Sequence, residues 1–200
     1  MKKNKIAFQG EKGAYSHIAS EEIFKDAEIK TCNTFEETFK TAFEDKDFKI
    51  IIPLENSLAG RVADIHYLLP KYKLQIYSEH FQQVEHNLLI KPEAKITDIK
   101  YVRSHAQAIG QCQDFIKKYN FKTIISADTA GSAKELAANN DISIGAIASE
   151  LSAKIYKLKI LNKNIEDEKG NMTRFLVMGK LVHQPEFKEE KKFITSCIFR

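Results

Sequence analysis

Asn171-Met172-Thr173-Arg174-Phe175-Leu176-Val177-Met178 is the segment from which we infer the fold and the site of this chain. The apolar run that begins at Phe175 is short and is followed by Gly179, a pattern typical of a buried strand. Thr173 and Arg174 lie at the start of that strand, and open α/β sheets bind their ligands where strands meet loops. We therefore expect a hydroxyl and a guanidinium beside a ligand site.

Short apolar runs alternate with amphipathic segments along the rest of the chain, which predicts an α/β fold with a mostly parallel sheet in each of two lobes. The polar stretch 162–171 returns the chain to the first lobe, so the chain crosses twice between the lobes and a cleft lies at the hinge. We expect lobe 1 at about 1–75 and 165–182, and lobe 2 at about 76–164. Strands are expected at 5–9, 29–32, 49–53, 76–80, 85–90, 101–103, 123–126, 143–145 and 175–180. One helix is expected to begin at about residue 16, and a second is expected to be capped by a capping box formed by Thr34 and Glu37. Further helices are expected at 61–69, 107–118, 129–139 and 147–156.

The C-terminal segment has a different pattern. Residues 183–192 are charged and contain Pro185, which favours a linker. The apolar run Phe193–Phe199 then predicts a lone strand. We interpret residues 193–200 as the beginning of a second domain that is cut off near its start.

Composition excludes several classes of protein. The chain has 200 residues, 43% of them apolar, and a net charge of +4 without a basic stripe, so a nucleic-acid partner is not expected. The three cysteines are far apart, which argues against a disulfide framework and a CxxC metal site, and the histidines lack metal-ligand spacing. No run approaches about 18 apolar residues, and the basic N-terminus lacks a signal-peptide core. We expect a cytoplasmic protein with no membrane span.

Four other segments place polar or small residues between a strand and a helix. In each, a ligand site competes with a plain turn or a helix cap. Glycines at 10–16 allow an anion to approach backbone N–H groups, and Glu55, Asn56 and Ser57 supply a carboxylate, an amide and a hydroxyl after a buried strand. Ser104 precedes Gln107 and Gln111, which share a helix face, and Thr129 and Ala130 begin another helix.

Taken in order, these motifs resemble the successive signatures of prephenate dehydratase. The resemblance covers about residues 4–180 and rests on Gly10–Ser16, Pro53–Gly60, Ser104–Ala108, Asp128–Ala133 and Asn171–Phe175. It implies two α/β lobes like those of type II periplasmic binding proteins, with the active site in the cleft. It also implies a homodimer or homotetramer and a C-terminal ACT domain that binds phenylalanine, of which 193–200 resembles the first strand. Ala106, in place of a common Pro, and the Glu11-Lys12 and Ala14-Tyr15 pairs depart from the family pattern without removing an expected catalytic residue.

The resemblance implies a carbon–oxygen lyase that converts prephenate to phenylpyruvate, water and CO2 in phenylalanine biosynthesis. Aromatisation drives the step, so no cofactor and no metal are expected. Thr173 is expected to donate a hydrogen bond to the leaving hydroxyl. Asn56 and Gln111 are the other expected catalytic residues, and the expected substrate-binding residues are Glu55, Ser57, Ser104, Thr129, Ala130, Arg174 and Phe175, with Glu55 and Arg174 acting by positioning neighbours or steering charge.

Other functions remain open from the sequence. Arogenate dehydratase catalyses the same elimination on a substrate with an amino group in place of the keto group. A two-lobed protein that binds a small molecule without catalysis would share the fold, and a purely structural fragment would neither bind nor turn over a substrate. Turnover of prephenate separates a dehydratase from a non-catalytic binding protein, and comparison with turnover of arogenate identifies the preferred substrate.

Overall fold

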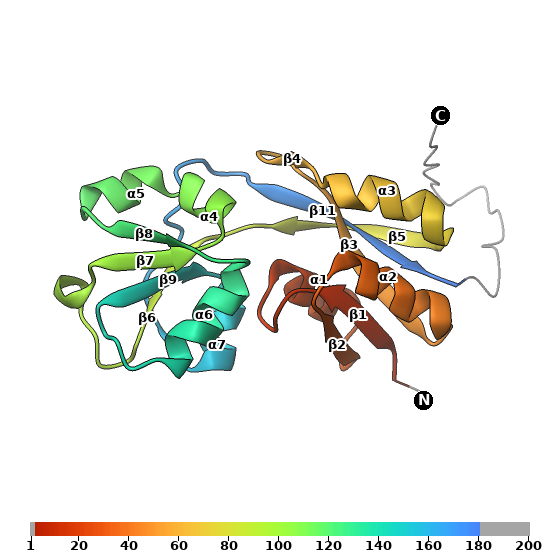
Figure 1. Ribbon diagram of the computed structural model, residues 1–200, viewed down its shortest axis with the longest axis horizontal. Coiled ribbons are helices and arrows are strands. Elements are labelled where there is room, and N and C mark those ends of the chain that lie inside the picture. The colour runs from red at the N-terminus through yellow and green to blue at the C-terminus, as the bar shows by residue number, and fades with distance from the viewer. Residues whose placement is uncertain (1–2, 181–200) are drawn as a thin grey trace.

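The computed structural model describes residues 3–180, which form two α/β lobes joined side by side (Figure 1). The predicted linker 183–192 and the predicted strand Phe193–Phe199 lie outside the described residues. The strands are β1 (Lys5–Gln9), β2 (Glu28–Cys32), β3 (Phe48–Asn56), β4 (Gly60–Arg61), β5 (Gln75–Gln83), β6 (Asn87–Ile90), β7 (Tyr101–Ser104), β8 (Lys122–Ile125), β9 (Ile144–Ala148), β10 (Lys159–Asn162) and β11 (Met172–Gly179). The helices are α1 (Tyr15–Ile23), α2 (Phe35–Glu44), α3 (Ala63–Tyr72), α4 (Ala106–Gly110), α5 (Gln113–Lys118), α6 (Thr129–Ala138) and α7 (Glu150–Tyr156), with a 3-10 turn at Ile96–Asp98.

Each lobe is built on one mixed sheet. The order in the first lobe is β2-β1-β3-β11-β5, with β4 paired to β3, and the order in the second lobe is β10-β6-β9-β7-β8. Pairing is parallel among β1, β2 and β3 and among β7, β8 and β9, whereas β11 is antiparallel to both β3 and β5. In the second sheet, β6 is antiparallel to both β9 and β10. Each sheet is thus parallel only in part.

The predicted α/β fold with two crossings is confirmed, but the first crossing lies later than predicted. β5 belongs to the first sheet, so the chain crosses at 84–86 rather than near residue 75. The second crossing is 163–171. The two crossing segments lie side by side: the backbone N–H of Val84 donates to the Asn171 carbonyl at 2.8 Å, and that of Ile165 donates to the His86 carbonyl at 2.8 Å.

Both faces of each sheet are buried at the central strands, as their continuous apolar runs require, whereas the edge strands β5 and β8 are largely exposed. Successive strand residues point to opposite faces, so Ile50 and Ile52 pack with α2 and α3 while Ile51 packs with α1. In the second lobe Leu88 packs with α4 and α5, and Leu89 packs with α6 and α7. This double cover leaves the ends of the strands as the place where polar side chains gather.

Helix boundaries depend on details that periodicity does not show. The Thr34 hydroxyl caps α2 by accepting from the Glu37 backbone N–H at 3.0 Å, as predicted, while the Glu37 carboxylate accepts from the Asn33 N–H. The predicted helix 107–118 is instead interrupted at Gln111 and Cys112, because the Asp167 carboxylate accepts the backbone N–H groups of Gln113 and Asp114 at 2.8 and 3.0 Å. The break places Gln111 at the end of α4.

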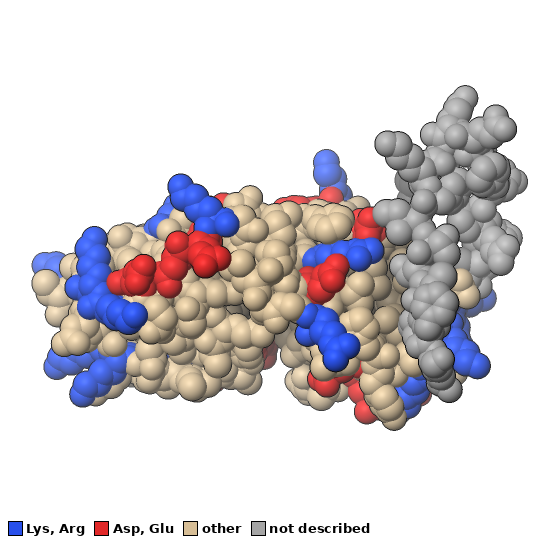
Figure 2. All heavy atoms as spheres, turned by 90° about the horizontal axis from the view of Figure 1, so that it is seen from above, with Lys and Arg blue, Asp and Glu red and all other residues tan. Residues whose placement is uncertain are grey.

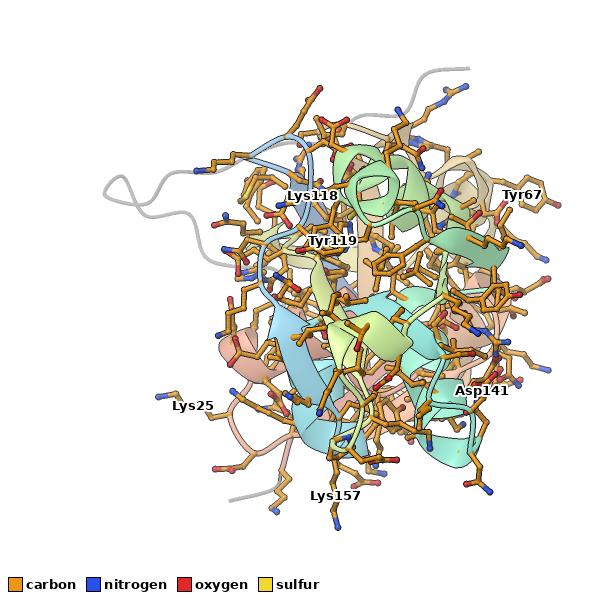
Figure 3. The ribbon with its side chains drawn as sticks, turned by 90° about the vertical axis from the view of Figure 1, so that its left-hand side faces the viewer. Lys25, Tyr67, Lys118, Tyr119, Asp141 and Lys157 are labelled. Atoms are coloured by element: carbon orange, nitrogen blue, oxygen red, sulfur yellow. The ribbon has the colours of Figure 1, made fainter. Side chains whose placement is uncertain are left out.

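The surface carries both signs of charge. Figure 2 shows Lys and Arg side chains interspersed with Asp and Glu on the face seen there, and none of them forms a continuous stripe. Side chains such as Tyr67, Asp141 and Lys157 point away from the body (Figure 3). No helix among the described residues is long and apolar enough to cross a membrane.

Candidate active site

A cavity of about 570 Å³ lies between the two lobes. It is lined from the first lobe by the ends of β1 and β3, by β4, and by the starts of α1, α2, α3 and β11. From the second lobe it is lined by α4 and by the start of α6. The crossing segments complete the lining. Its residues are Gln9, Tyr15, Phe35, Pro53, Asn56, Ala59, Gly60, Arg61, Val62, Ala63, Asp64, Val84, His86, His105, Gln107, Ala108, Gln111, Ala127, Asp128, Thr129, Asn171 and Thr173.

Thr173 and Asn56 face each other on neighbouring strands at this cavity. They are cross-strand partners of β11 and β3, and the Asn56 Nδ2 donates to Thr173 Oγ1 at 2.9 Å. The Asn56 Oδ1 accepts the backbone N–H groups of Leu58 and Ala59 at 3.0 and 2.8 Å. Since the Thr173 oxygen is an acceptor in this contact, its own O–H remains available to donate to a ligand.

The hydrogen bonds continue from Asn56 across the crossing segments into the second lobe. Asn56 Nδ2 also donates to Asn171 Oδ1 at 2.6 Å, and Asn171 Nδ2 donates to Gln111 Oε1 at 3.0 Å. His86 Nε2 lies 2.9 Å from the same Gln111 oxygen, and Tyr15 Oη lies 3.1 Å from His86 Nδ1. We call this set the polar network, and its members are Thr173, Asn56, Asn171, Gln111, His86 and Tyr15.

The structure brings some of the predicted site residues together. Thr173, Asn56, Gln111 and Thr129 all line the cavity. Thr129 begins α6, where the Asp128 side chain caps the helix by accepting the Gly131 N–H at 2.6 Å. The roles predicted for these residues stay predictions, but their position fits them.

Other predicted residues do not line the cavity. Ser104, Ala130 and Phe175 are buried in the lobes with at most 2% of their surface exposed. Ser104 Oγ donates to the Ile147 carbonyl at 2.7 Å, which ties β7 to β9. Phe175 packs under α1. Their placement assigns these side chains to the packing around the site.

Arg174 and Glu55 lie outside the cavity as well, because successive residues of a strand face opposite sides and Thr173 faces inward. The Arg174 guanidinium donates to the Glu55 carboxylate at 3.1 Å and to the Glu79 carboxylate at 2.7 Å. These carboxylates raise the pKa of Arg174. Ser57 also lies outside, where its hydroxyl accepts the Met172 N–H at 2.9 Å and so joins the ends of β3 and β11.

The loop 10–14, a predicted anion site, joins the lobes instead. The Gly13 carbonyl accepts from Ser149 Oγ at 2.6 Å and from Ser152 Oγ at 3.1 Å, and Tyr156 Oη donates to the Lys12 carbonyl at 2.9 Å. Glu11 forms an ion pair with Lys134 of α6 at 2.8 Å. We call these contacts the interlobe contact. Within the loop region, only its flanking residues Gln9 and Tyr15 line the cavity.

Sequence reasoning missed several lining residues, above all His86, Asn171 and Arg61. His86 and Asn171 are nearly fully buried, at 2% and 1% exposure. The sequence does contain a signal for Asn171, since it directly precedes the Met172-Thr173-Arg174 segment. His86 lies between Glu85 and Asn87, just before the apolar run Leu88–Ile90, where a single histidine gives no pattern.

Charges at the cavity are few. The charged side chains of the lining are those of Arg61, Asp64 and Asp128. Arg61 forms no ion pair with any described residue. Burial lowers the pKa of His86, against the opposing effects of the Gln111 hydrogen bond and the Glu166 carboxylate. Burial also raises the pKa of Tyr15. Among residues 3–180, no group of three or more His, Cys, Asp or Glu side chains is arranged to hold a metal ion.

A family model described as prephenate dehydratase matches residues 6–182 of the chain. The chain belongs to the prephenate dehydratase family. Arogenate dehydratase/prephenate dehydratase 1 of Arabidopsis thaliana is 36% identical over 197 residues, which are 98% of this chain and 50% of that protein. The bifunctional N-acyl-homoserine lactone acylase/prephenate dehydratase of Komagataeibacter europaeus is 38% identical over 178 residues, or 88% and 62% of the two chains.

Solved structures of prephenate dehydratases share the fold. That of Staphylococcus aureus is 26% identical with a TM-score of 0.77, covering 92% of this chain and 68% of that one. That of Arthrobacter aurescens, in complex with L-Phe, is 24% identical with a TM-score of 0.84, covering 92% and 63%, a likeness of fold alone. The chain spans about half the length of the plant relatives that it matches.

Proposed function

We propose that this chain carries the catalytic unit of a prephenate dehydratase, a carbon–oxygen lyase of phenylalanine biosynthesis. In the reaction, the bond from the ring carbon to the carboxylate breaks and CO2 leaves. The freed electron pair aromatises the ring and expels the hydroxide at the opposite carbon, which becomes water on taking a proton. Prephenate dianion thus yields phenylpyruvate, CO2 and hydroxide, and the protein has to hold the dianion and stabilise the departing hydroxide.

The observation that carries this proposal is the hydroxyl of Thr173 on the cavity lining, whose oxygen accepts from Asn56 at 2.9 Å, so that its own proton is left to donate. The pKa of an alcohol is too high for simple acid catalysis. A hydrogen bond that strengthens as negative charge grows on the leaving oxygen is the chemistry that such a donor supplies. Family membership supports the same assignment.

Substrate oxygens need further donors. The Gln111 oxygen already accepts from Asn171 and stands 2.9 Å from His86 Nε2, so the Nε2 amide group of Gln111 is left to donate to a ligand. Thr129 supplies a hydroxyl from the second lobe. Arg61, the last residue of β4, is the cation on the cavity lining, and we assign it to attract a substrate carboxylate.

Arogenate dehydratase is the second candidate function. Two Arabidopsis thaliana relatives carry both activities in their names, and other plant relatives are named arogenate dehydratase alone. Asp64 of the cavity lining is a carboxylate that could pair with the ammonium group of arogenate. The non-catalytic binding protein remains the alternative outside the enzymes. The resemblance predicts phenylalanine as an effector only where the full ACT domain is present, and this condition and the oligomeric state stay predictions.

Turnover tests the proposal. The purified chain is incubated with prephenate and, separately, with arogenate, and phenylpyruvate and phenylalanine are measured. We expect product from prephenate well above the uncatalysed rate. Absence of product from both substrates, in a chain shown to be folded, overturns the proposal in favour of a binding protein.

The Thr173 assignment has its own test. Thr173→Ala removes the donor and should lower kcat by about 10²- to 10³-fold, the scale for losing one such hydrogen bond. Thr173→Ser keeps the hydroxyl and serves as the matched control, which should retain most of the rate. A near-normal kcat in folded Thr173→Ala contradicts the assignment.

A further inference from the structure

The donor and acceptor atoms of the polar network can be assigned one after another, starting from two backbone N–H groups. The N–H groups of Leu58 and Ala59 can only donate, so the side-chain atom of Asn56 that they contact must be its oxygen. The Asn56 Nδ2 therefore faces Asn171. Unlike most side-chain amides, whose oxygen and nitrogen look alike, this one has its orientation determined by two main-chain donors.

The same assignment of donors and acceptors continues through Asn171 and Gln111 to His86. Asn171 accepts from Asn56 at 2.6 Å with Oδ1, so its Nδ2 donates to Gln111, and the Gln111 atom there is the oxygen. The Gln111 Oε1 has no proton to give. His86 Nε2, 2.9 Å away, must then carry the proton of this hydrogen bond.

The other side of the His86 ring meets the first lobe. The Tyr15 hydroxyl has one proton and two acceptors within reach: the Glu85 carbonyl at 2.6 Å and, when the His86 proton is on Nε2, His86 Nδ1 at 3.1 Å. The two rings meet edge to face, with centroids 5.9 Å apart. The backbone of His86 is held as well, because its N–H donates to the Glu166 carboxylate at 2.9 Å and its carbonyl accepts from Ile165.

We propose that His86 is a positioning residue, whose Nε2 proton, with the ring held by Tyr15, turns the Gln111 amide so that its NH₂ group faces the ligand. With its oxygen held between Asn171 and His86, Gln111 can present only donors to the cavity. Such a group suits a carboxylate or keto oxygen and disfavours a cationic one. The consequence for turnover rests on the proposed function, whereas the tautomer of His86 does not.

The first experiment reads the tautomer without any substrate. Long-range ¹H–¹⁵N correlation spectra of the whole chain, assigned with His86→Gln, should show a protonated Nε2 on His86 at pH 8. In Tyr15→Phe the His86 signals should shift. A neutral His86 with its proton on Nδ1 overturns the proposal whether or not the chain turns over prephenate.

The second experiment uses prephenate turnover. His86→Leu removes the donor to Gln111 and should raise KM, lowering kcat/KM by about 10- to 100-fold, the scale for leaving one buried polar group unpaired. His86→Gln places an amide N–H near the former Nε2 and should recover most of the loss. Tyr15→Phe, a milder change, keeps the test informative if His86→Leu does not fold, and should lower kcat/KM by less than His86→Leu.

A double-mutant cycle separates positioning from general packing. In a Gln111→Ala background His86→Leu should have almost no further effect on kcat/KM, because the group that His86 positions is gone. Additive losses from the two substitutions overturn the proposal. If the wild-type chain is inactive, the proposed function fails, and the tautomer measurement still decides the role of His86.

Discussion

Replacing Gly13 by Ala should weaken the interlobe contact. Gly13 adopts a φ of +95°, and a Cβ there would lie 2.4 Å from Ser152 Oγ and 2.8 Å from Ser152 Cα. The second distance involves backbone, so rotation of the serine side chain cannot relieve it. The lobes must separate locally, and the Ser149 and Ser152 hydrogen bonds to the Gly13 carbonyl are then lost.

The magnitude follows from two costs. A non-glycine residue with positive φ costs roughly 1–2 kcal/mol, and inserting a methyl group into a packed contact typically costs about 1–3 kcal/mol more. Gly170 provides the matched control, since its φ is +83° and an added Cβ meets nothing within 4 Å. Gly170→Ala therefore bears the first cost only, and the difference between the variants isolates the clash.

Thermal unfolding followed by circular dichroism measures this difference. For a chain of this size, the extra cost corresponds to a Tm about 2–12 °C lower in Gly13→Ala than in Gly170→Ala. Tyr15 lies two residues after Gly13, so kcat/KM for prephenate should fall in Gly13→Ala as well. Equal Tm and equal kcat/KM in the two variants would refute the reasoning.

Three further predictions follow from the site and its surroundings. Ser104→Ala removes a buried hydrogen bond to the Ile147 carbonyl and should lower the free energy of unfolding by about 1–3 kcal/mol, with KM for prephenate unchanged. A raised KM at unchanged Tm would instead support the predicted substrate-binding role of Ser104. Arg61→Ala should raise KM for prephenate several-fold, and the increase should be larger at low salt, where charges are screened less. Arg61→Lys keeps the charge and is the control. An unchanged KM across salt concentrations contradicts the assignment of Arg61 to a substrate carboxylate. Burial lowers the pKa of both His17 and His86, so the unfolded chain takes up protons first as pH falls below about 6.5, and stability should decline from there through the lowered pKa values. Tm measured between pH 8 and pH 5 tests this, with His86→Gln expected to flatten the decline and a constant Tm counting against it.

The sequence predicted those features that depend on local pattern. The alternation of apolar strands and amphipathic helices, the cap at Thr34 and the strand that contains Phe175 all appear in the structure. These depend on residues near one another in the chain. The position of the cavity residues Thr173 and Asn56 also follows from strand ends, which pattern reveals well.

Features that depend on partners far along the chain were not predictable. β5 reads as an ordinary strand, and only its pairing with β11 assigns it to the first lobe. Arg174 looks like a ligand residue until Glu55 and Glu79 are seen to bind it on the opposite face. The buried His86 becomes visible as a site residue only through its hydrogen bond to Gln111, which is distant in sequence.

The crossing segments both connect the two lobes and supply residues to the site. Both contribute to the polar network, His86 from 84–86 and Asn171 from 163–171, and they are hydrogen-bonded to each other. A lobe therefore cannot be exchanged between homologues independently of the segments that connect it to the other lobe. A chimaera that takes one lobe from another protein has to inherit both crossing segments from a single parent, because chemistry and connection occupy the same residues.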